Sequence, residues 1–430
     1  MHIFFSGIGG TAIGPLALIA QQAGYEVSGS DQQDSQYIHF LREHGITDVT
    51  IGQSAKDIAA VHAKQPIDWL VYSSAVAIEN PDHPELVFAR EHNIKTTKRD
   101  ELLNEIIKAK HLKLIAVAGT HGKTTTTAMM IWLLQELGIQ VSYSVGAKTS
   151  FAEMGHYDPD SHYFVYECDE YDRNFLSFHP FLSLITGIDW DHADIFPTRE
   201  MYEAAFQQFI TQSHRTIIWQ ADADKLGLTD GHDISVLKDA EEATTSLTLP
   251  GKVNRQDAWQ VIAALQHVHE TPFAEAVEIM NRFPGVSRRF ETIQPNLYTD
   301  YAHTPEKIRG ALQLAHEVAG DNVVVVYEGL HNTRQHFIKD DLKHLFDDVK
   351  QLYVVPSYLA REDKKLKLLS PGDIIKLTEH PDKAAPRELD DNLKQTITQH
   401  VQAGDIVLCL TAGGGGSLDE WLRAQFPPAD

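Results

Sequence analysis

The chain has 430 residues, of which 37 are lysine or arginine and 60 are aspartate or glutamate, so its formal net charge at pH 7 is −23. A negative charge of this size repels nucleic acids and anionic membrane surfaces, and we expect neither as a partner. No run reaches the roughly 18 apolar residues of a membrane helix. At about 150 residues per domain, the length predicts about three domains.

The two cysteines and the N-terminal segment bear on the cellular compartment. Cys168 and Cys409 are too few and too far apart in sequence for a disulfide framework or a cysteine-based metal site, and Cys168 is expected to be a packing residue. The N-terminal segment lacks lysine and arginine and is interrupted by glycines and by Pro15, which is not typical of a signal peptide. We therefore expect a cytoplasmic protein. We also expect it to be a monomer or a homodimer.

Apolar runs of strand length alternate with helical patterns along the chain, which is typical of parallel βαβ units and predicts an α/β fold. The predicted strands are residues 2–5, 26–28, 69–72, 114–118, 163–166, 182–186, 323–327, 351–355 and 406–410. The clearest predicted helices are residues 11–23, 35–43 and 124–137. Charged or proline-containing stretches divide the pattern into three units, residues 1–111, 112–293 and 294–430.

A glycine turn follows the first predicted strand. Gly7, Gly9, Gly10 and Gly14 open the first helix, and Asp31 ends the second strand. Glycines at this place allow backbone N–H groups to approach a phosphate, and an acid after the second strand suits a ribose hydroxyl. The pattern alone favours a nucleotide diphosphate such as NAD, and the alternative is a turn that serves only helix–strand packing.

A phosphate loop is predicted at the next strand-to-helix junction, with the sequence Gly119-Thr120-His121-Gly122-Lys123-Thr124. It is one residue shorter than the common Walker pattern, yet its parts can still act as they do there. The glycines allow N–H groups to surround a phosphate, Lys123 reaches the β and γ oxygens, and the Thr124 hydroxyl can hold Mg²⁺. ATP is the expected ligand.

Acidic residues follow two of the predicted strands. Glu167 begins a run that contains four acids between positions 167 and 172, and His192 lies in an Asp-rich segment after the next strand. A carboxylate at a strand end beside a phosphate loop is a usual Mg²⁺ ligand. The alternative for the acids is a solvated loop, and His192 is a structural residue or a ligand of a second ion.

These motifs together resemble the Mur ligases, the ATP-dependent amide-forming enzymes of peptidoglycan precursor synthesis. The resemblance is greatest to the branch that acts on UDP-N-acetylmuramate. The residues of this chain that carry the resemblance are the loop from Ala118 to Thr127, the turn Gly7-Ile8-Gly9-Gly10, the Ser73-Ser74-Ala75 segment, residues 285–290 and residues 300–305. The resemblance implies an N-terminal Rossmann-like UDP-binding domain, a central P-loop ATPase-like domain and a C-terminal Rossmann-like domain that binds the amine. It also implies that the first turn holds UDP rather than NAD.

The resemblance assigns roles residue by residue. ATP would be bound by Gly119, Thr120, Gly122, Lys123, Thr124, Thr125, Asn254, Asp300 and His303. Mg²⁺ would be held by Thr124 and Glu167, and a second ion by His192 with Glu167. The UDP-sugar would contact Gly7, Gly9, Gly10, Asp31, Ser73 and Ser74, and its carboxylate would lie near His121 and Arg288 or Arg289. Arg334 would help to bind the amine. Residues 253–258, where Asn254 would contact adenine, depart from the family's usual sequence.

The amine donor and two rival functions stay open at this point. The branch adds either L-alanine or a whole tripeptide to the sugar. Residues 169–172 and 328–333 favour the tripeptide, whereas Gly7–Gly10 and Thr124–Thr127 favour L-alanine. A nicotinamide-dependent oxidoreductase would explain the first turn but not Lys123 or Glu167. A nucleotide-binding regulator would explain the phosphate loop without any chemistry.

Overall fold

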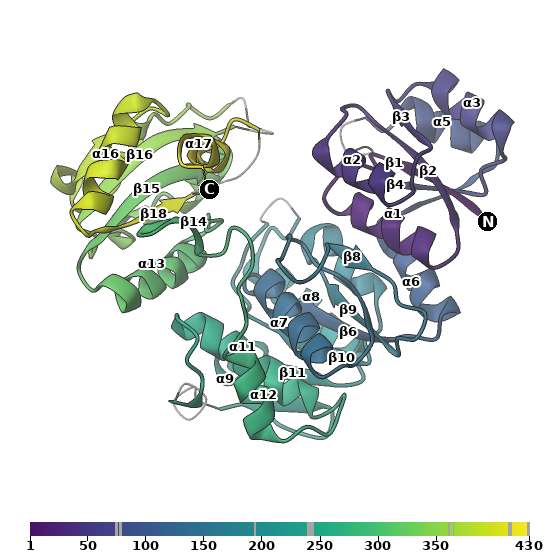
Figure 1. Ribbon diagram of the computed structural model, residues 1–430, viewed down its shortest axis with the longest axis horizontal. Helices are drawn as coiled ribbons and strands as arrows, with labels where there is room; N and C mark the ends of the chain where they lie inside the picture. The colour runs from purple at the N-terminus through teal and green to yellow at the C-terminus, as the bar shows by residue number, and fades with distance from the viewer. Residues whose placement is uncertain are drawn as a thin grey trace. The chain divides into compact units, whose positions relative to one another are not determined.

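The computed structural model describes residues 1–73, 76, 80–192, 195–238, 245–359, 362–363, 365–411 and 415–427. The chain forms two compact units, the first made of residues 1–239 and 257–283 and the second of residues 240–256 and 284–430. Three sheets, drawn in Figure 1, are distributed over these units, two in the first and one in the second. The α/β class predicted from the sequence is confirmed.

The N-terminal sheet is entirely parallel and has the strand order β3-β2-β1-β4-β5. Its strands are β1 (His2–Ser6), β2 (Glu26–Asp31), β3 (Val49–Ile51), β4 (Trp69–Tyr72) and β5 (Lys95–Lys98). Its helices are α1 (Ile13–Gln22), α2 (Gln36–Glu43), α3 (Ala55–Lys64), α5 (Pro84–Glu91) and α6 (Arg99–Ala109). Strand order reverses between β1 and β4, and ligands of doubly wound sheets bind at the carboxyl end of such a reversal.

The central sheet has the order β12-β11-β10-β6-β9-β7-β8 and is parallel except for the β7–β8 pair. The strands are β6 (Lys113–Ala118), β7 (Val141–Ser144), β8 (Gly155–His156), β9 (Tyr163–Glu167), β10 (Leu182–Ile185), β11 (Thr216–Trp219) and β12 (Ile234–Leu237). The helices are α7 (Lys123–Glu136), α8 (Arg199–Gln212), α9 (Gln220–Leu226), α11 (Lys252–Leu265), α12 (Phe273–Met280) and the short 3₁₀ helix η1 (Tyr171–Ser177). Strands β6, β9 and β10 are buried over almost their whole length, as their apolar sequences predict.

The sheet of the second unit has the order β13-β14-β18-β15-β16-β17, and only β13 and β14 are antiparallel. Its strands are β13 (Glu291–Gln294), β14 (Leu297–Asp300), β15 (Val323–Leu330), β16 (Gln351–Tyr358), β17 (Ala384–Pro386) and β18 (Ile406–Leu410). Its helices are α13 (Pro305–Ala319), α14 (Asn332–Ile338), α15 (Pro371–Ile375), α16 (Asp391–Gln402), α17 (Leu418–Gln425) and the 3₁₀ helices η2 (Asp341–His344) and η3 (Pro381–Lys383).

The side chains of β15 alternate between two hydrophobic cores of this unit. Val323, Val325 and Tyr327 belong to the cluster that includes residues of α13, whereas Val324 and Val326 belong to the cluster that includes residues of α16 and α17. Successive side chains of a strand point to opposite faces, so a continuous apolar run is needed when helices cover both faces.

Several strands were missing from the sequence prediction, and others were longer than predicted. β5 reads Lys-Thr-Thr-Lys and β3 has three residues, so neither carries an apolar run. β15 continues to Leu330 through Glu328, whose buried carboxylate accepts a hydrogen bond from the Leu418 N–H at 3.0 Å. Cys168 and Cys409 are buried free thiols. Within the described ranges, no helix is both long and apolar enough to cross a membrane.

Candidate active site

The phosphate loop connects β6 to α7, as the sequence predicts. Gly119 has φ +151° and Gly122 has φ +75°, and a Cβ atom at Gly119 would collide with the Thr186 hydroxyl. Gly122 is the N-cap residue of α7, so the loop delivers Lys123 and Thr124 to the first turn of the helix. Thr125, also on this turn, is half-buried. Backbone N–H groups at a helix N-terminus are suited to bind phosphate.

Lys123 is held by two oxygen atoms within the site. Its Nζ donates to the Gly119 carbonyl at 2.6 Å and to Glu170 Oε2 at 2.5 Å, and the Glu170 side chain is only 1% exposed. Burial alone would lower the pKa of Lys123, but the charges of Glu170 and Asp169 outweigh it and raise this pKa above its ordinary value. Lys123 is therefore a cation at neutral pH.

Thr124 and Glu167 place two oxygen donors together at the end of β9. Thr124 Oγ1 donates to Glu167 Oε1 at 2.8 Å, and the Gly146 N–H donates to Glu167 Oε2 at 2.6 Å. In the described part of the chain, no group of three or more His, Cys, Asp or Glu side chains is placed to hold a metal. Mg²⁺ commonly takes only one or two protein oxygens and completes its shell with water and phosphate, so this pair fits a nucleotide-bound Mg²⁺.

Glu170 is a functional candidate that the sequence analysis did not single out within its acidic run. Besides Lys123, its carboxylate lies 3.6 Å from His192 Nε2 and 3.5 Å from the Tyr202 hydroxyl. Tyr202 in turn contacts Thr120 Oγ1 at 2.7 Å. The sequence prediction joined His192 to Glu167, whereas the glutamate that the structure places against its Nε2 is Glu170. Nothing in the sequence pointed to Tyr202, which lies on α8, far along the chain from the loop.

His121 is oriented by a separate acidic group. Its Nε2 lies 3.0 Å from Asp189 Oδ2, and Lys225 Nζ lies 3.1 Å from Asp189 Oδ1. The hydrogen bond from His121 and the charge of Lys225 lower the pKa of Asp189 to about 2. The carboxylate is thus ionised at neutral pH and fixes the ring of His121 beside the loop.

The glycine turn after β1 is folded as predicted, but its N–H groups have partners within the protein. Gly7 has φ +80°, and the N–H groups of Gly7 and Ile8 both donate to the Ser30 carbonyl at 2.9 Å. The Gly9 N–H donates to Asp31 Oδ2 at 2.8 Å, and the Gly10 N–H to the Gly7 carbonyl at 3.1 Å. A diphosphate that binds the Gly9 N–H would have to replace Asp31 there. Ser73 directly follows β4 and lies beside this turn, and Ser74 lies outside the described residues.

The remaining predicted residues belong to the second unit, where most of them form one cluster. The guanidinium carbons of Arg288 and Arg289 lie 4.7 and 5.4 Å from the centre of the Tyr301 ring. His303 Nδ1 lies 2.9 Å from the Tyr301 carbonyl, and burial lowers the pKa of His303 well below its ordinary value, an effect to which Arg334 adds. Burial raises the pKa of Asp300 to about 6, although Arg289 opposes the rise.

Asn254 makes a contact of a different kind from those of this cluster. It sits near the start of α11, and its side-chain amide donates to the Pro250 carbonyl at 2.8 Å. The neighbouring Arg255 pairs with Glu317 at 2.6 Å. The segment that departs from the family sequence is thus part of the second unit up to residue 256, and its Asp257 belongs to the first unit.

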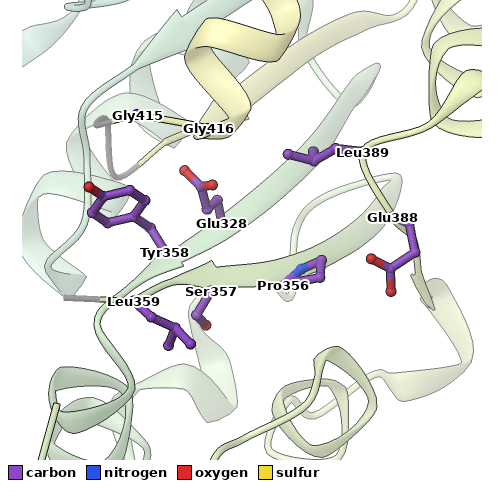
Figure 2. Close-up of a pocket in the computed structure, with 9 residues that line it drawn as sticks. All are labelled: Glu328, Pro356, Ser357, Tyr358, Leu359, Glu388, Leu389, Gly415 and Gly416. Carbon is purple, nitrogen blue, oxygen red and sulfur yellow. The ribbon is translucent and has the colours of Figure 1, made fainter.

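A cavity of about 470 Å³ opens at the carboxyl ends of β15 and β16 in the second unit. Figure 2 shows the Glu328 carboxylate pointing toward Gly415 and Gly416. The Leu389 side chain points toward Glu328 from the right of the view. The described lining residues are Glu328, Pro356, Ser357, Tyr358, Leu359, Glu388, Leu389, Gly415 and Gly416. Two carboxylates and no cation among them suit an ammonium group better than an anion, and the volume is that of an ordinary small-molecule site.

Comparison with known proteins places the whole chain in one family. Residues 2–111 match the model for the Mur ligase family catalytic domain, residues 117–270 that for the Mur ligase middle domain, and residues 288–413 that for the Mur ligase glutamate ligase domain. A protein named UDP-N-acetylmuramate–L-alanine ligase from Gloeobacter violaceus is 30% identical, over 99% of this chain and 96% of the relative. The chain belongs to the Mur ligase family.

Two solved structures extend the comparison of this Mur ligase. The UDP-N-acetylmuramate–alanine ligase MurC from Thermotoga maritima has a TM-score of 0.76 and 25% identity, over 99% of this chain and 98% of that one. The UDP-N-acetylmuramate:L-alanyl-γ-D-glutamyl-meso-diaminopimelate ligase from Neisseria meningitides has a TM-score of 0.56 and 27% identity, over 67% of this chain and 99% of that one. The predicted family and the three-domain α/β organisation are confirmed.

Proposed function

We propose that this Mur ligase joins the lactyl carboxylate of UDP-N-acetylmuramate to L-alanine in the cytoplasm, with ATP as the source of energy and Mg²⁺ as the metal. The observation that carries the proposal is the phosphate loop, in which Lys123 lies beside Glu170 and Thr124 beside Glu167. The relatives named for this reaction support the choice of substrates. Residues 1–111 would bind the UDP-sugar, residues 112–293 ATP, and residues 294–430 the amine.

The first chemical step would be attack of the lactyl carboxylate on the γ-phosphate of ATP, which gives an acyl phosphate and ADP. Two like charges at about 4 Å repel by about 4 kcal/mol at an effective dielectric constant of 20. Lys123 offsets this repulsion at the phosphate, and His121, Arg288 or Arg289 at the carboxylate. Mg²⁺ held by Thr124 and Glu167 would neutralise phosphate charge, and His192 with Glu167 and Glu170 would support a second ion.

The second step would be attack of the amine on the activated carbonyl, with loss of phosphate to leave an amide. We assign the donor to the cavity that Glu328 and Glu388 line, where it would bind in its ammonium form and lose one proton to solvent before it attacks, and we assign its carboxylate to Arg334. Because Glu388 is exposed, Glu388→Gln should fold normally and raise the KM for the amine by about threefold, as expected for a partly solvated charge contact. Steady-state kinetics would check this, with the KM for ATP as the internal control. An unchanged KM for the amine would contradict the assignment.

A second candidate donor is the tripeptide L-alanyl-γ-D-glutamyl-meso-diaminopimelate. The cavity of about 470 Å³ leaves room for a donor larger than alanine, and one similar solved structure is named for that reaction. In separate reactions of ATP and UDP-N-acetylmuramate with each donor, we expect mass spectrometry to show a product with L-alanine and none with the tripeptide. Product with the tripeptide alone would establish the second candidate.

The same reactions separate the ligase from the two rival functions. Phosphate release that requires both the UDP-sugar and an amine is expected of the ligase but not of a nucleotide-binding regulator. Binding of NAD(P) in a fluorescence titration, together with no phosphate release, would support an oxidoreductase instead.

A further inference from the structure

A fully buried carboxyl group lies beneath the glycine turn of the N-terminal domain. Glu85, on the first turn of α5, is 0% exposed, and Ser6 Oγ donates a hydrogen bond to its Oε2 at 2.5 Å. The Ser30 hydroxyl is close enough to this carboxyl group to lower its pKa. The Gln53 side-chain amide connects the two hydroxyls, at 3.3 Å from Ser6 Oγ and 3.4 Å from Ser30 Oγ. We call Ser6, Ser30, Gln53 and Glu85 the Glu85 cluster.

The two serines of this cluster are the residues that hold the turn. Ser6 directly precedes Gly7, and the Ser30 carbonyl accepts the N–H groups of both Gly7 and Ile8. Glu85 thus ties β1 to β2 at the point where the turn leaves the sheet. We propose that Glu85 is a positioning residue of the UDP-sugar site, which holds the diphosphate-binding turn by binding Ser6 and Ser30. The proposal rests on the function given above, since it takes the turn to be the diphosphate site.

The charge of Glu85 also bears on the binding of an anion. Burial raises the pKa of Glu85 from 4.5 to about 7, Asp57 on α3 and Asp31 on β2 add to the rise, and the serine hydroxyls oppose it. His83 Nδ1 lies 4.0 Å from Glu85 Oε2, but burial lowers the pKa of His83, so it supplies no compensating cation at neutral pH. Glu85 is therefore neutral below about pH 7. Above about pH 7 it becomes a buried anion close to the glycine turn.

A diphosphate binds better beside a neutral group than beside an anion, so its affinity falls as the pH rises through the pKa of Glu85. The probe is UDP-N-acetylmuramate without ATP, because its diphosphate is a diester that does not titrate near neutral pH. We expect its affinity, measured by calorimetry, to fall roughly tenfold between about pH 6 and pH 8.5. In Glu85→Gln this fall should disappear, since glutamine still accepts a hydrogen bond from Ser6 but has no charge to gain. Glu91→Gln, at the exposed end of the same helix, should keep the wild-type slope.

A second variant tests the clamp apart from the charge. Glu85→Leu removes the hydrogen bond from Ser6 and the polar contact with Ser30, and should weaken UDP-sugar binding about tenfold at every pH. ATP affinity and thermal melting report whether the rest of the first unit is folded. Three results would overturn this inference but leave the proposed function standing. They are a UDP-sugar affinity of the wild type that does not change with pH, a pH dependence in Glu85→Gln equal to that of the wild type, and a wild-type affinity in Glu85→Leu. A wild-type chain that binds no UDP-sugar at any pH overturns the proposed function together with this inference.

Discussion

Replacing Lys123 with alanine is expected to abolish phosphate release from ATP in the presence of UDP-N-acetylmuramate and L-alanine. In the proposed function the ammonium group would contact the β and γ oxygens of ATP, and loss of such a contact in phosphoryl transfer costs about 10³-fold or more in rate. A phosphate-release assay with saturating substrates measures the loss. Lys56→Ala, at an exposed position of α3, is the matched control and should retain full activity.

The same substitution should also reduce stability, because it leaves the Glu170 carboxylate buried without the cation that lies 2.5 Å from it. Removing one partner of a buried ion pair costs about 3 kcal/mol or more. The double variant Lys123→Ala with Glu170→Gln removes both charges, so its melting temperature should recover toward that of the wild type. Its activity should not recover. Near-normal turnover in either variant would contradict the role given to Lys123.

The sequence carries the parts of the fold that depend on local pattern. The buried strands β6, β9 and β10 are apolar runs of the expected length, and Gly119 and Gly122 mark the loop because their positive φ angles exclude other residues without strain. Thr124 lies on the first turn of α7, which follows the carboxyl end of β6, and Glu167 is the last residue of β9. Strands β6 and β9 are paired in the sheet. The sequence places each residue near a strand end, and the resemblance to the Mur ligases joins the two; that β6 and β9 are neighbours is seen only in the folded sheet.

The contacts that the sequence does not carry are those between polar groups far apart in the chain. Glu85 lies in the helical sequence Pro-Glu-Leu-Val-Phe-Ala-Arg-Glu, where a glutamate at the first turn is ordinarily a solvated residue. Its complete burial depends on Ser6 and Ser30, which only the folded sheet brings to it. Likewise, the free N–H groups expected at the glycine turn are bonded to Ser30 and Asp31, because a buried backbone donor takes whatever acceptor the fold supplies.

Glu167→Gln is expected to weaken the apparent affinity of the enzyme for Mg²⁺ by at least about tenfold. Glutamine has the shape of glutamate and can accept the Gly146 N–H with its oxygen while its amide faces Thr124, so the local fold should be retained. It cannot supply the negative oxygen that a hard cation prefers. A high Mg²⁺ concentration should therefore restore part of the activity of Glu167→Gln. It should not restore the activity of Lys123→Ala.

Two measurements separate metal binding from a general defect in the site. Calorimetry of Mn²⁺ with ATP reports the metal directly and should show weaker binding in Glu167→Gln, whereas Glu101→Gln at an exposed position of α6 should bind like the wild type. Thr124→Ser keeps the hydroxyl that donates to Glu167 Oε1 at 2.8 Å, so it should retain most of the metal affinity, and Thr124→Ala should not. Since the serine and alanine variants differ by one oxygen atom at this position, equal metal affinities in the two would show that the threonine oxygen is no ligand. An unaltered Mn²⁺ affinity in Glu167→Gln would remove the carboxylate from the metal site as well.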